Sequence, residues 1–189
     1  MHGLMFVEFR RYVIATHGER VWTSARGRLQ APPRSYLTGR VYPDAEFKAL
    51  LQATATLLAR DPLALQEEFG VFLAPELARF FAPQIDPSWD ALDLMEHVED
   101  IIHSSVRRTL PGATPPRFRV TRSGPDVLRL EYESSRQMCG IARGIARGVG
   151  IHFGQPLEVS ETHCRRRGES KCEFLIRPAA PSAGPVPNA

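Results

Sequence analysis

The chain has 189 residues, of which 43% are hydrophobic and 24% are charged, as in an ordinary globular domain with one core. Its net charge of +3 and pI near 9.0 come from basic residues spread along the chain, which do not form the concentrated basic face that nucleic-acid binding needs. Apolar runs fall short of the ~20 residues of a membrane span, and the N-terminus lacks a signal-peptide pattern, so we expect a soluble cytoplasmic protein.

The first half of the chain has the periodicity of helices and almost no strand pattern. Apolar residues recur at helical spacing from Leu4 to a stop near Gly18, and core packing explains them without any ligand. A shorter helix is expected around Val21–Leu29, before a loop through Pro32 and Pro33. The pattern predicts an N-terminal bundle of helices.

Three aspartates are expected to cap helices in this half. Asp44 precedes the helical pattern of residues 47–60, and its carboxylate suits a helix N-terminus. Asp61 and Asp86 are each followed by proline, which is favoured at the first helical position. The first of these pairs predicts a helix towards Gly70, and the second predicts the start of the next long helix.

That next helix leads to a proline-rich turn and carries a histidine on its apolar face. Because each helical residue turns by about 100°, His103 shares one side of the helix with Leu92, Met95, Val106 and Leu110. His97 points about 120° away and is expected at the surface. A lone histidine on an apolar face is more often a packed core side chain than a ligand, so the helix alone leaves both interpretations open.

The following segment predicts two strands, residues 118–123 and 127–136, joined by a turn at residues 123–126. Strand side chains alternate between faces, so one face is expected to carry Leu128, Leu130, Tyr132, Ser134 and Arg136. This row ends in two hydroxyl donors and a guanidinium that can bind bidentately. Such a fork is suited to a pair of carboxylates, for example the propionates of a haem.

The sequence resembles the haem nitric-oxide/oxygen-binding (H-NOX) domains, a family related to the haem domain of soluble guanylate cyclase. The resemblance rests on Tyr132-x-Ser134-x-Arg136, which matches the family's YxSxR propionate clamp, and on His103, nine residues before Gly112 of the PGATPPR segment. It extends to the MHGL start, the YPD segment at residues 42–44 and the EEFG segment at residues 67–70. It therefore spans nearly the whole chain.

The resemblance implies a haem b cofactor and a non-enzymatic gas sensor. His103 would be the axial ligand of the iron, the clamp residues would hold the propionates, and Pro116 would press on the haem. Met5 and Phe9 of the first helix would line the distal pocket. The resemblance further implies that NO weakens the bond from iron to His103, and that the freed helix is read by a separate partner such as a histidine kinase or a cyclic-nucleotide enzyme.

Oxygen-binding members of the family carry a distal tyrosine on the helix after YxSxR. Five residues past Arg136 this sequence has Ile141. Bound dioxygen carries partial negative charge and benefits from a hydrogen-bond donor, whereas bound NO needs one much less. An apolar pocket therefore predicts a ferrous sensor that selects NO over oxygen.

The segment after the clamp carries three glycines at a spacing of four residues. Gly140, Gly144 and Gly148 form a groove along one face of the predicted helix, which lets another backbone or a flat ligand approach closely. We expect this helix to pack closely onto the sheet. The chain lacks GxGxxG, P-loop and GxSxG motifs, so the familiar nucleotide and hydrolase signatures are missing, and no acid/base pair suggests an enzyme acting at the iron.

The C-terminal part predicts a hairpin of residues 156–164 and 171–178. If it turns symmetrically about Gly168, Cys164 lies opposite Cys172, and Cys139 can join them from the preceding helix. An odd count of three cysteines in a cytoplasmic chain argues against a disulfide framework. The cysteines can be small buried hydrophobes or, equally, part of a zinc site.

The fourth ligand of such a zinc site is open. His163 would complete a Cys₃His set, but it is adjacent to Cys164 in a strand and should face the opposite way, so Glu161 is another candidate. This cluster supports an alternative function, a haem-free small-molecule, redox or zinc sensor, since the C-terminal pattern is also similar to that of a vinyl-reductase-like domain.

Together these patterns predict an α+β protein. We expect one domain over residues 1–177, with an N-terminal helical bundle packed on a C-terminal antiparallel sheet and the haem buried between them. Residues 178–189 are rich in proline and alanine, lack apolar periodicity and are expected to be disordered.

Overall fold

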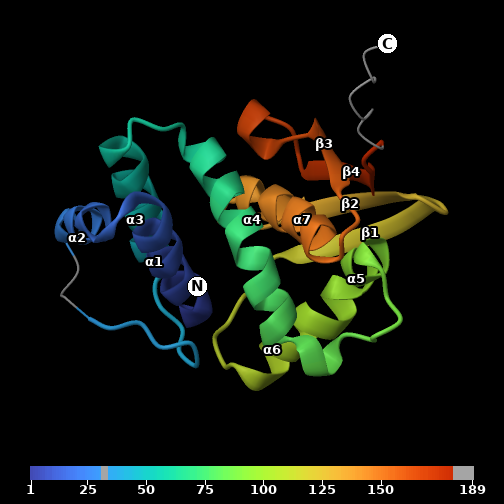
Figure 1. Ribbon diagram of the computed structural model, residues 1–189, viewed down its shortest axis with the longest axis horizontal. Coiled ribbons are helices and arrows are strands. Elements are labelled where there is room, and N and C mark those ends of the chain that lie inside the picture. The colour runs from blue at the N-terminus through green and yellow to red at the C-terminus, as the bar shows by residue number, and fades with distance from the viewer. Residues whose placement is uncertain (31–33, 181–189) are drawn as a thin grey trace, which may run out of the picture.

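The protein divides into a helical half and a half built on a sheet. The computed structural model describes residues 1–30 and 34–180. Figure 1 shows α4 running between the two halves, with the three N-terminal helices on one side and the sheet on the other. The helices of the first half are α1 (Gly3–His17), α2 (Glu19–Gly27), α3 (Asp44–Leu57) and the central α4 (Pro62–Phe80). The predicted N-terminal bundle is confirmed.

The second half combines four strands with the remaining helices. A short 3₁₀ turn (Ala82–Gln84) leads to α5 (Ala91–Val98), a π-helical turn η2 (Glu99–His103) and α6 (Ser104–Thr109). The strands are β1 (Arg117–Gly124), β2 (Val127–Glu133), β3 (Leu157–His163) and β4 (Cys172–Pro178), with α7 (Cys139–His152) between β2 and β3 and a 3₁₀ turn (Arg165–Arg167) in the last hairpin.

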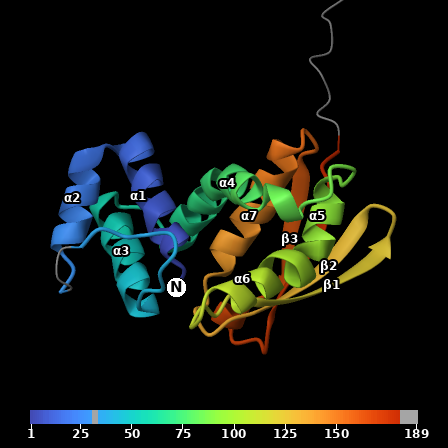
Figure 2. The ribbon, with the colours of Figure 1, turned by 90° about the horizontal axis from the view of Figure 1, so that it is seen from below.

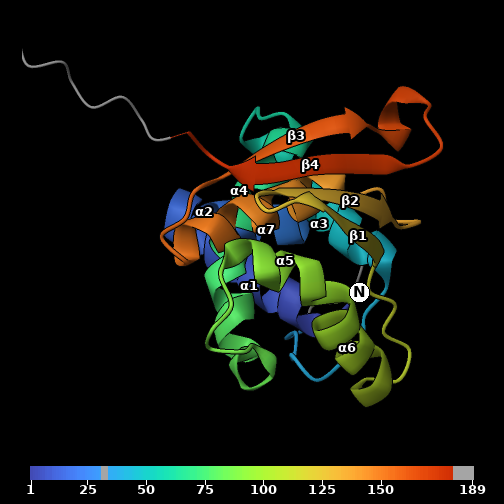
Figure 3. The ribbon, with the colours of Figure 1, turned by 90° about the vertical axis from the view of Figure 1, so that its right-hand side faces the viewer.

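The sheet has the strand order β1-β2-β4-β3, and all its neighbouring strands are antiparallel. Helices α5 and α7 cover one face of the sheet (Figure 3). The view in Figure 2 shows α1–α3 at one end, the sheet with α5 and α6 at the other, and α4 and α7 in the middle. The predicted α+β class is therefore confirmed.

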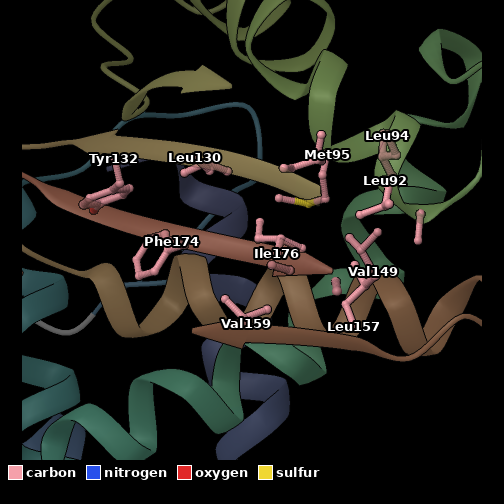
Figure 4. Packing of buried hydrophobic residues seen from close by; sticks show 14 of the residues in the cluster. Leu92, Leu94, Met95, Leu130, Tyr132, Val149, Leu157, Val159, Phe174 and Ile176 are labelled. Carbon is pink, nitrogen blue, oxygen red and sulfur yellow. The ribbon is translucent and has the colours of Figure 1, made fainter. Parts of the chain in front are cut away.

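Two hydrophobic cores meet at α4 and α7. The core of the sheet half is formed by Leu128, Leu130, Phe174 and Ile176 of the sheet, with side chains from α5 and α7 packed against them (Figure 4). The core of the helical half is rich in aromatic residues, among them Phe6, Phe9, Tyr12, Phe47 and Phe69. Helix α4 contributes Ala74 to the first core and Phe69 to the second, so it is shared by both.

Helix α7 packs onto the sheet as expected, but its glycine face lies against α4. A Cβ atom added to Gly144 would lie 2.1 Å from the Glu67 carbonyl oxygen, and one added to Gly70 would lie 2.4 Å from that of Ile141. These separations are far shorter than any side-chain contact allows. The glycine groove therefore holds another helix backbone.

One of the three predicted caps is confirmed and two are wrong. Asp61 accepts a hydrogen bond from the Ala64 amide at 2.9 Å, with Pro62 at the first helical position. Asp44 is the first residue of α3, and Pro43 stands at the cap position, because the Asp44 carboxylate is used in longer-range contacts. Asp86 accepts from Ser88 in a turn, and the cap of α5 is Asp90, paired with Asp93 in a capping box.

The helix that carries His103 is not regular. The amide of Ser104 donates to the carbonyl of Glu99, five residues back, which makes residues 99–103 a π-helical turn between α5 and α6. Such turns are rare and are frequent at functional sites. Met95, His103 and Val106 line one cavity, whereas Leu92 and Leu110, which a regular helix would place on the same side, do not.

The clamp strand ends earlier than expected. Strand β2 stops at Glu133, and Ser134–Arg136 lie in a turn in which the Arg136 amide donates to the Ser134 hydroxyl at 3.2 Å. Serine side chains commonly bond a backbone amide two residues on and so compete with strand pairing. Strand alternation thus does not determine how Ser134 and Arg136 are oriented.

The predicted hairpin of the last two strands is confirmed, with Gly168 in the left-handed region at φ 89°. Strand β4 includes Pro178, one residue past the expected domain end, and the Ala179 amide donates to Pro156. The predicted loop at Pro32 and Pro33 and residues 181–189 of the predicted tail lie outside the described residues. Within residues 1–30 and 34–180, no helix is both long and apolar enough to cross a membrane.

Candidate functional site

A cavity of about 190 Å³ lies between the two halves of the molecule. One wall is formed by η2, α6 and the first residues of β1, and the opposite wall by α1, α4 and α7. Nearly all of the lining side chains are apolar, and apart from His2 the polar ones gather at two places, around His103 and around the end of β2. Enclosed apolar cavities with a few convergent polar groups are the usual form of a cofactor site.

His103 lies in the cavity wall with one ring nitrogen already bound. Its Nδ1 is 3.0 Å from Oε2 of Glu99, one helical turn earlier, and the ring packs edge-on against Phe118 with the centroids 4.8 Å apart. The side chain is only 14% exposed. Because Nδ1 faces Glu99, Nε2 is the nitrogen that can bind a metal in the cavity.

Glu99 is the centre of a small polar cluster behind His103. Its Oε2 also accepts from the Phe118 amide at 3.0 Å, and its Oε1 accepts from Arg107 at 2.5 Å. Burial by itself would raise the pKa of Glu99, but the hydrogen bonds from His103, Phe118 and Arg107 outweigh it and lower this pKa to about 2. Glu99 is therefore an ionised acceptor at neutral pH.

The second polar place is the predicted clamp. Tyr132, Ser134 and Arg136 all line the cavity, and Arg136 is 9% exposed. The Arg136 guanidinium donates to the backbone and hydroxyl oxygens of Thr114, and its Nε forms a 2.9 Å ion pair with Asp44 of α3. Burial raises the pKa of Tyr132 to about 12, so its hydroxyl keeps its proton and can donate.

Asp44 joins the rim of the cavity to the first helix. Besides Arg136, it binds the amino group of Met1 at 2.6 Å, and this amino group also donates to the Tyr42 carbonyl. Burial would raise the pKa of Asp44, but its two cationic partners outweigh it and hold the pKa below its usual value. This ion-pair chain is the polar contact between the two halves at the rim.

Most residues expected around a haem lie in the cavity wall. Met5 and Ile141 line it from the side opposite His103, and Pro116 lines it next to the turn before β1. Phe9 does not line the cavity. Its ring is fully buried between Phe47 and Phe69, at centroid distances of 5.5 and 5.1 Å, in the core of the helical half.

The residues present fit a haem. A haem has two apolar faces and one acidic edge, and the cavity has apolar walls with hydroxyl and guanidinium donors at its rim. A second histidine, His2, also lines the cavity, but its Nδ1 accepts from the Leu4 amide at the start of α1. His103 thus has the better context for an axial ligand.

The three cysteines come together behind the clamp. Ligand atoms of Cys139, Cys164, Cys172 and Glu161 all lie within 4.8 Å of one another, and the three cysteines are buried. Burial first, and then the neighbouring thiols, raise the pKa of Cys139 to about 12. His163 is not part of this group, because its side chain is half exposed on the other side of the strand, 3.5 Å from Glu173.

Three contacts of the site were not predicted. The four-residue spacing from Glu99 to His103 is a signal in the sequence that identifies such a pair, because residues at this spacing share a helix face. The contact of Glu99 with the Phe118 amide and that of Asp44 with Arg136 join segments far apart in the chain. No local pattern indicates them.

The fold and the cavity define a class of α+β domain with an apolar cavity between a helical half and a sheet half, one imidazole in the wall and a cationic rim. A family model described as Haem-NO-binding matches residues 2–161. The chain therefore belongs to the Haem-NO-binding, or H-NOX, family, whose members bind haem and act as gas sensors rather than as catalysts.

Solved structures agree with this assignment. An H-NOX protein from S. oneidensis in the Fe(II)NO ligation state is 25% identical, with a TM-score of 0.88, and the match covers 95% of this chain and 100% of that chain. The Fe(II) unliganded H-NOX protein from K. algicida is 21% identical, with a TM-score of 0.84 over 96% and 98% of the two chains, and shows the same fold. Among curated proteins, none matches this chain.

Proposed function

We propose that this chain is a sensor of nitric oxide that uses a ferrous haem b in the central cavity. His103 would hold the iron through Nε2, and Tyr132, Ser134 and Arg136 would bind the propionates. The observation that carries the proposal is the placement of His103 in the wall of an apolar cavity whose rim carries these three donors. When bound, the haem would supply the iron that binds a diatomic gas.

The selectivity for NO rests on the wall opposite His103. Met5, Leu77, Ile141 and Ala142 present only apolar atoms of their side chains there. These four side chains offer bound dioxygen no hydrogen bond, whereas NO requires little stabilisation. The S. oneidensis relative was solved with NO on its iron, which supports NO as the ligand for this chain as well.

The segment that carries His103 is the proposed output element. Helices η2 and α6 hold His103 and connect through a short loop to Pro116, which lines the same cavity. A change at His103 would therefore displace this segment relative to α4 and α7. We propose that a separate signalling protein, such as a histidine kinase or a cyclic-nucleotide enzyme, reads the displacement.

The visible spectrum of the purified ferrous protein tests this function. We expect a Soret band that shifts with NO and does not shift in air-saturated buffer. A band that shifts in air would contradict the selectivity, and reconstituted protein without a Soret band would contradict haem binding. Turnover of peroxide with a bound haem would favour an enzyme instead.

A second candidate function rests on the cysteine cluster, which we propose as a structural or redox-sensing zinc site. The Sγ atoms of Cys139 and Cys164 are 3.9 Å apart, close to the ~3.8 Å that two thiolates share on a tetrahedral zinc with Zn–S bonds of about 2.3 Å. Cys172 and Glu161 complete four ligand atoms. Glu161 also pairs with Arg167 at 3.0 Å, so zinc would compete with that cation for it.

Zinc content measured on protein purified without chelator tests this site. We expect about one zinc per chain in the unsubstituted protein, and loss of the metal in Cys172→Ser. His163→Ala is the matched control, because the exposed His163 ring lies outside the cluster and its removal should leave the zinc in place. If no zinc is found, or if His163→Ala removes it, the proposed ligand set is wrong.

A further inference from the structure

The contact between Glu99 and His103 has a direct chemical consequence for the ring. A carboxylate accepts hydrogen bonds, so the 3.0 Å contact favours the tautomer of His103 that carries its proton on Nδ1. In that tautomer Nε2 is the nitrogen with a lone pair for a metal. The second nitrogen of a metal-binding histidine commonly donates to a carboxylate, which fixes the tautomer and raises the basicity of the ligand.

Glu99 is itself held in place by two other segments. The Phe118 amide of β1 donates to Oε2, the same oxygen that faces His103, and Arg107 of α6 donates to Oε1. The Glu99 side chain is only 20% exposed. Its position is therefore fixed by the sheet and by the following helix, and it cannot rotate away from His103 without breaking these bonds.

We propose that Glu99 is a positioning residue that fixes the tautomer and orientation of His103 and so sets how strongly this chain binds iron through Nε2. The inference rests on the proposed axial ligation by His103. Arg107 acts in the opposite sense, because its guanidinium draws charge from the carboxylate and weakens the hydrogen bond that Glu99 accepts from His103. The two residues together determine the electron density on the ring.

Resonance Raman spectroscopy of the ferrous protein without added gas measures the iron–histidine stretching frequency. We expect this frequency to fall in Glu99→Gln, since an amide oxygen is a weaker acceptor than a carboxylate. We expect it to rise in Arg107→Met, where the carboxylate is no longer shared. The rate of haem transfer to excess apomyoglobin should increase by about 10-fold or more in Glu99→Gln, the usual effect of removing such a partner.

Glu96→Gln is the matched control. Glu96 lies on α5, one helical turn before the π-helical turn, and binds Arg122 of β1 at 2.7 Å without touching His103. Its substitution removes a similar link between helix and sheet and should leave both the frequency and the transfer rate unchanged. Equal shifts in Glu96→Gln and Glu99→Gln would overturn the proposal, because the effect would then be structural.

The outcomes separate this inference from the proposed function. If the Soret band of His103→Gly equals that of the unsubstituted protein, the ligand is elsewhere and the proposed function itself fails. If that band changes but Glu99→Gln and Arg107→Met leave the stretching frequency unmoved, only the role of Glu99 is wrong. Should Glu99→Gln not fold, the upward shift expected for Arg107→Met still decides the question.

Discussion

The two walls of the cavity differ in the chemistry they offer. The wall of η2, α6 and β1 carries an imidazole with the half-buried carboxylate of Glu99 behind it, at an Nδ1–Oε2 distance of 3.0 Å. The wall of α1, α4 and α7 is apolar and includes Met5 and Ile141. The first wall would hold a metal through His103, and the apolar side chains of the second would shape the space around whatever binds there. Affinity for the haem iron and selectivity among gases would therefore depend on different segments of the chain.

Among the substitutions considered, removal of the His103 imidazole is expected to have the largest effect on the difference between the two walls. In His103→Gly we expect the iron to lose its protein ligand completely. Added imidazole should bind in the space left by the side chain. The absorption spectrum and the iron–histidine Raman band report both steps. Glycine within a helix also costs about 1 kcal/mol of stability relative to alanine.

The control for this substitution is His97→Gly. His97 is exposed and stacks on Trp89, with the ring centroids 4.6 Å apart, so its loss should impose a similar helix cost without changing the spectrum. A His103→Gly protein with an unchanged spectrum would contradict the assignment of the ligand-bearing wall. His2 would then be the next candidate, since it also lines the cavity.

The apolar wall can be disrupted at the contact between α4 and α7. In Gly144→Ala the new methyl group would lie 2.1 Å from the Glu67 carbonyl oxygen, so α4 and α7 must move apart, and overpacking of this kind costs about 1–3 kcal/mol. Thermal unfolding measures the loss. Gly27→Ala on α2 is the control, because a Cβ there meets nothing within 4 Å, and a similar loss in that variant would contradict the explanation.

The chemistry of the apolar wall can be changed with one hydroxyl group. Ile141→Tyr brings a donor into the cavity and should raise oxygen affinity by about tenfold, which corresponds to one hydrogen bond of ~1.4 kcal/mol. Oxygen titration of the ferrous protein gives the affinity. Ile141→Phe supplies the same ring without the donor and should not raise it; a rise in both variants would assign the effect to shape.

The smallest expected effect is at the rim, where Asp44 joins the halves through Arg136. Because the folded state lowers the pKa of Asp44 below 3.8, the stability it contributes is fully present above pH 3.8 and is lost as the pH falls below that value. Asp44→Asn should cost about 1 kcal/mol at pH 7, since the pair is partly exposed. Urea unfolding at pH 7 and pH 3 should show this cost shrinking at low pH; a constant cost would contradict it.

The sequence predicted the parts of the molecule that local patterns control. Helical periodicity and the Asp61–Pro62 pair identified elements that form as expected, and the alternation in the last two strands identified their hairpin. His103 and the clamp residues were assigned to one site by the resemblance to the H-NOX family, since the helix pattern alone left the role of His103 open. All four residues line one cavity.

The features that the sequence did not predict depend on tertiary contacts. Phe9 has the same helical face pattern as Met5, but the space between Phe47 and Phe69 draws its ring into the core. The π-helical turn at Glu99 is formed where the Phe118 amide and Arg107 both bind the carboxylate, and the first of these comes from another element. Periodicity along one segment carries no information about such partners.

The backbone contact between α4 and α7 bears on how the domain can deform. Because the backbones of α4 and α7 meet directly at Gly70 and Gly144, few side chains can rearrange at that contact, and we expect the two helices to resist sliding and to move as one body. Both cores are anchored on this pair. We therefore expect any hinge in this domain to lie outside the α4–α7 pair. Helices α1–α3 on one side and α5–α6 on the other can each rotate relative to that pair.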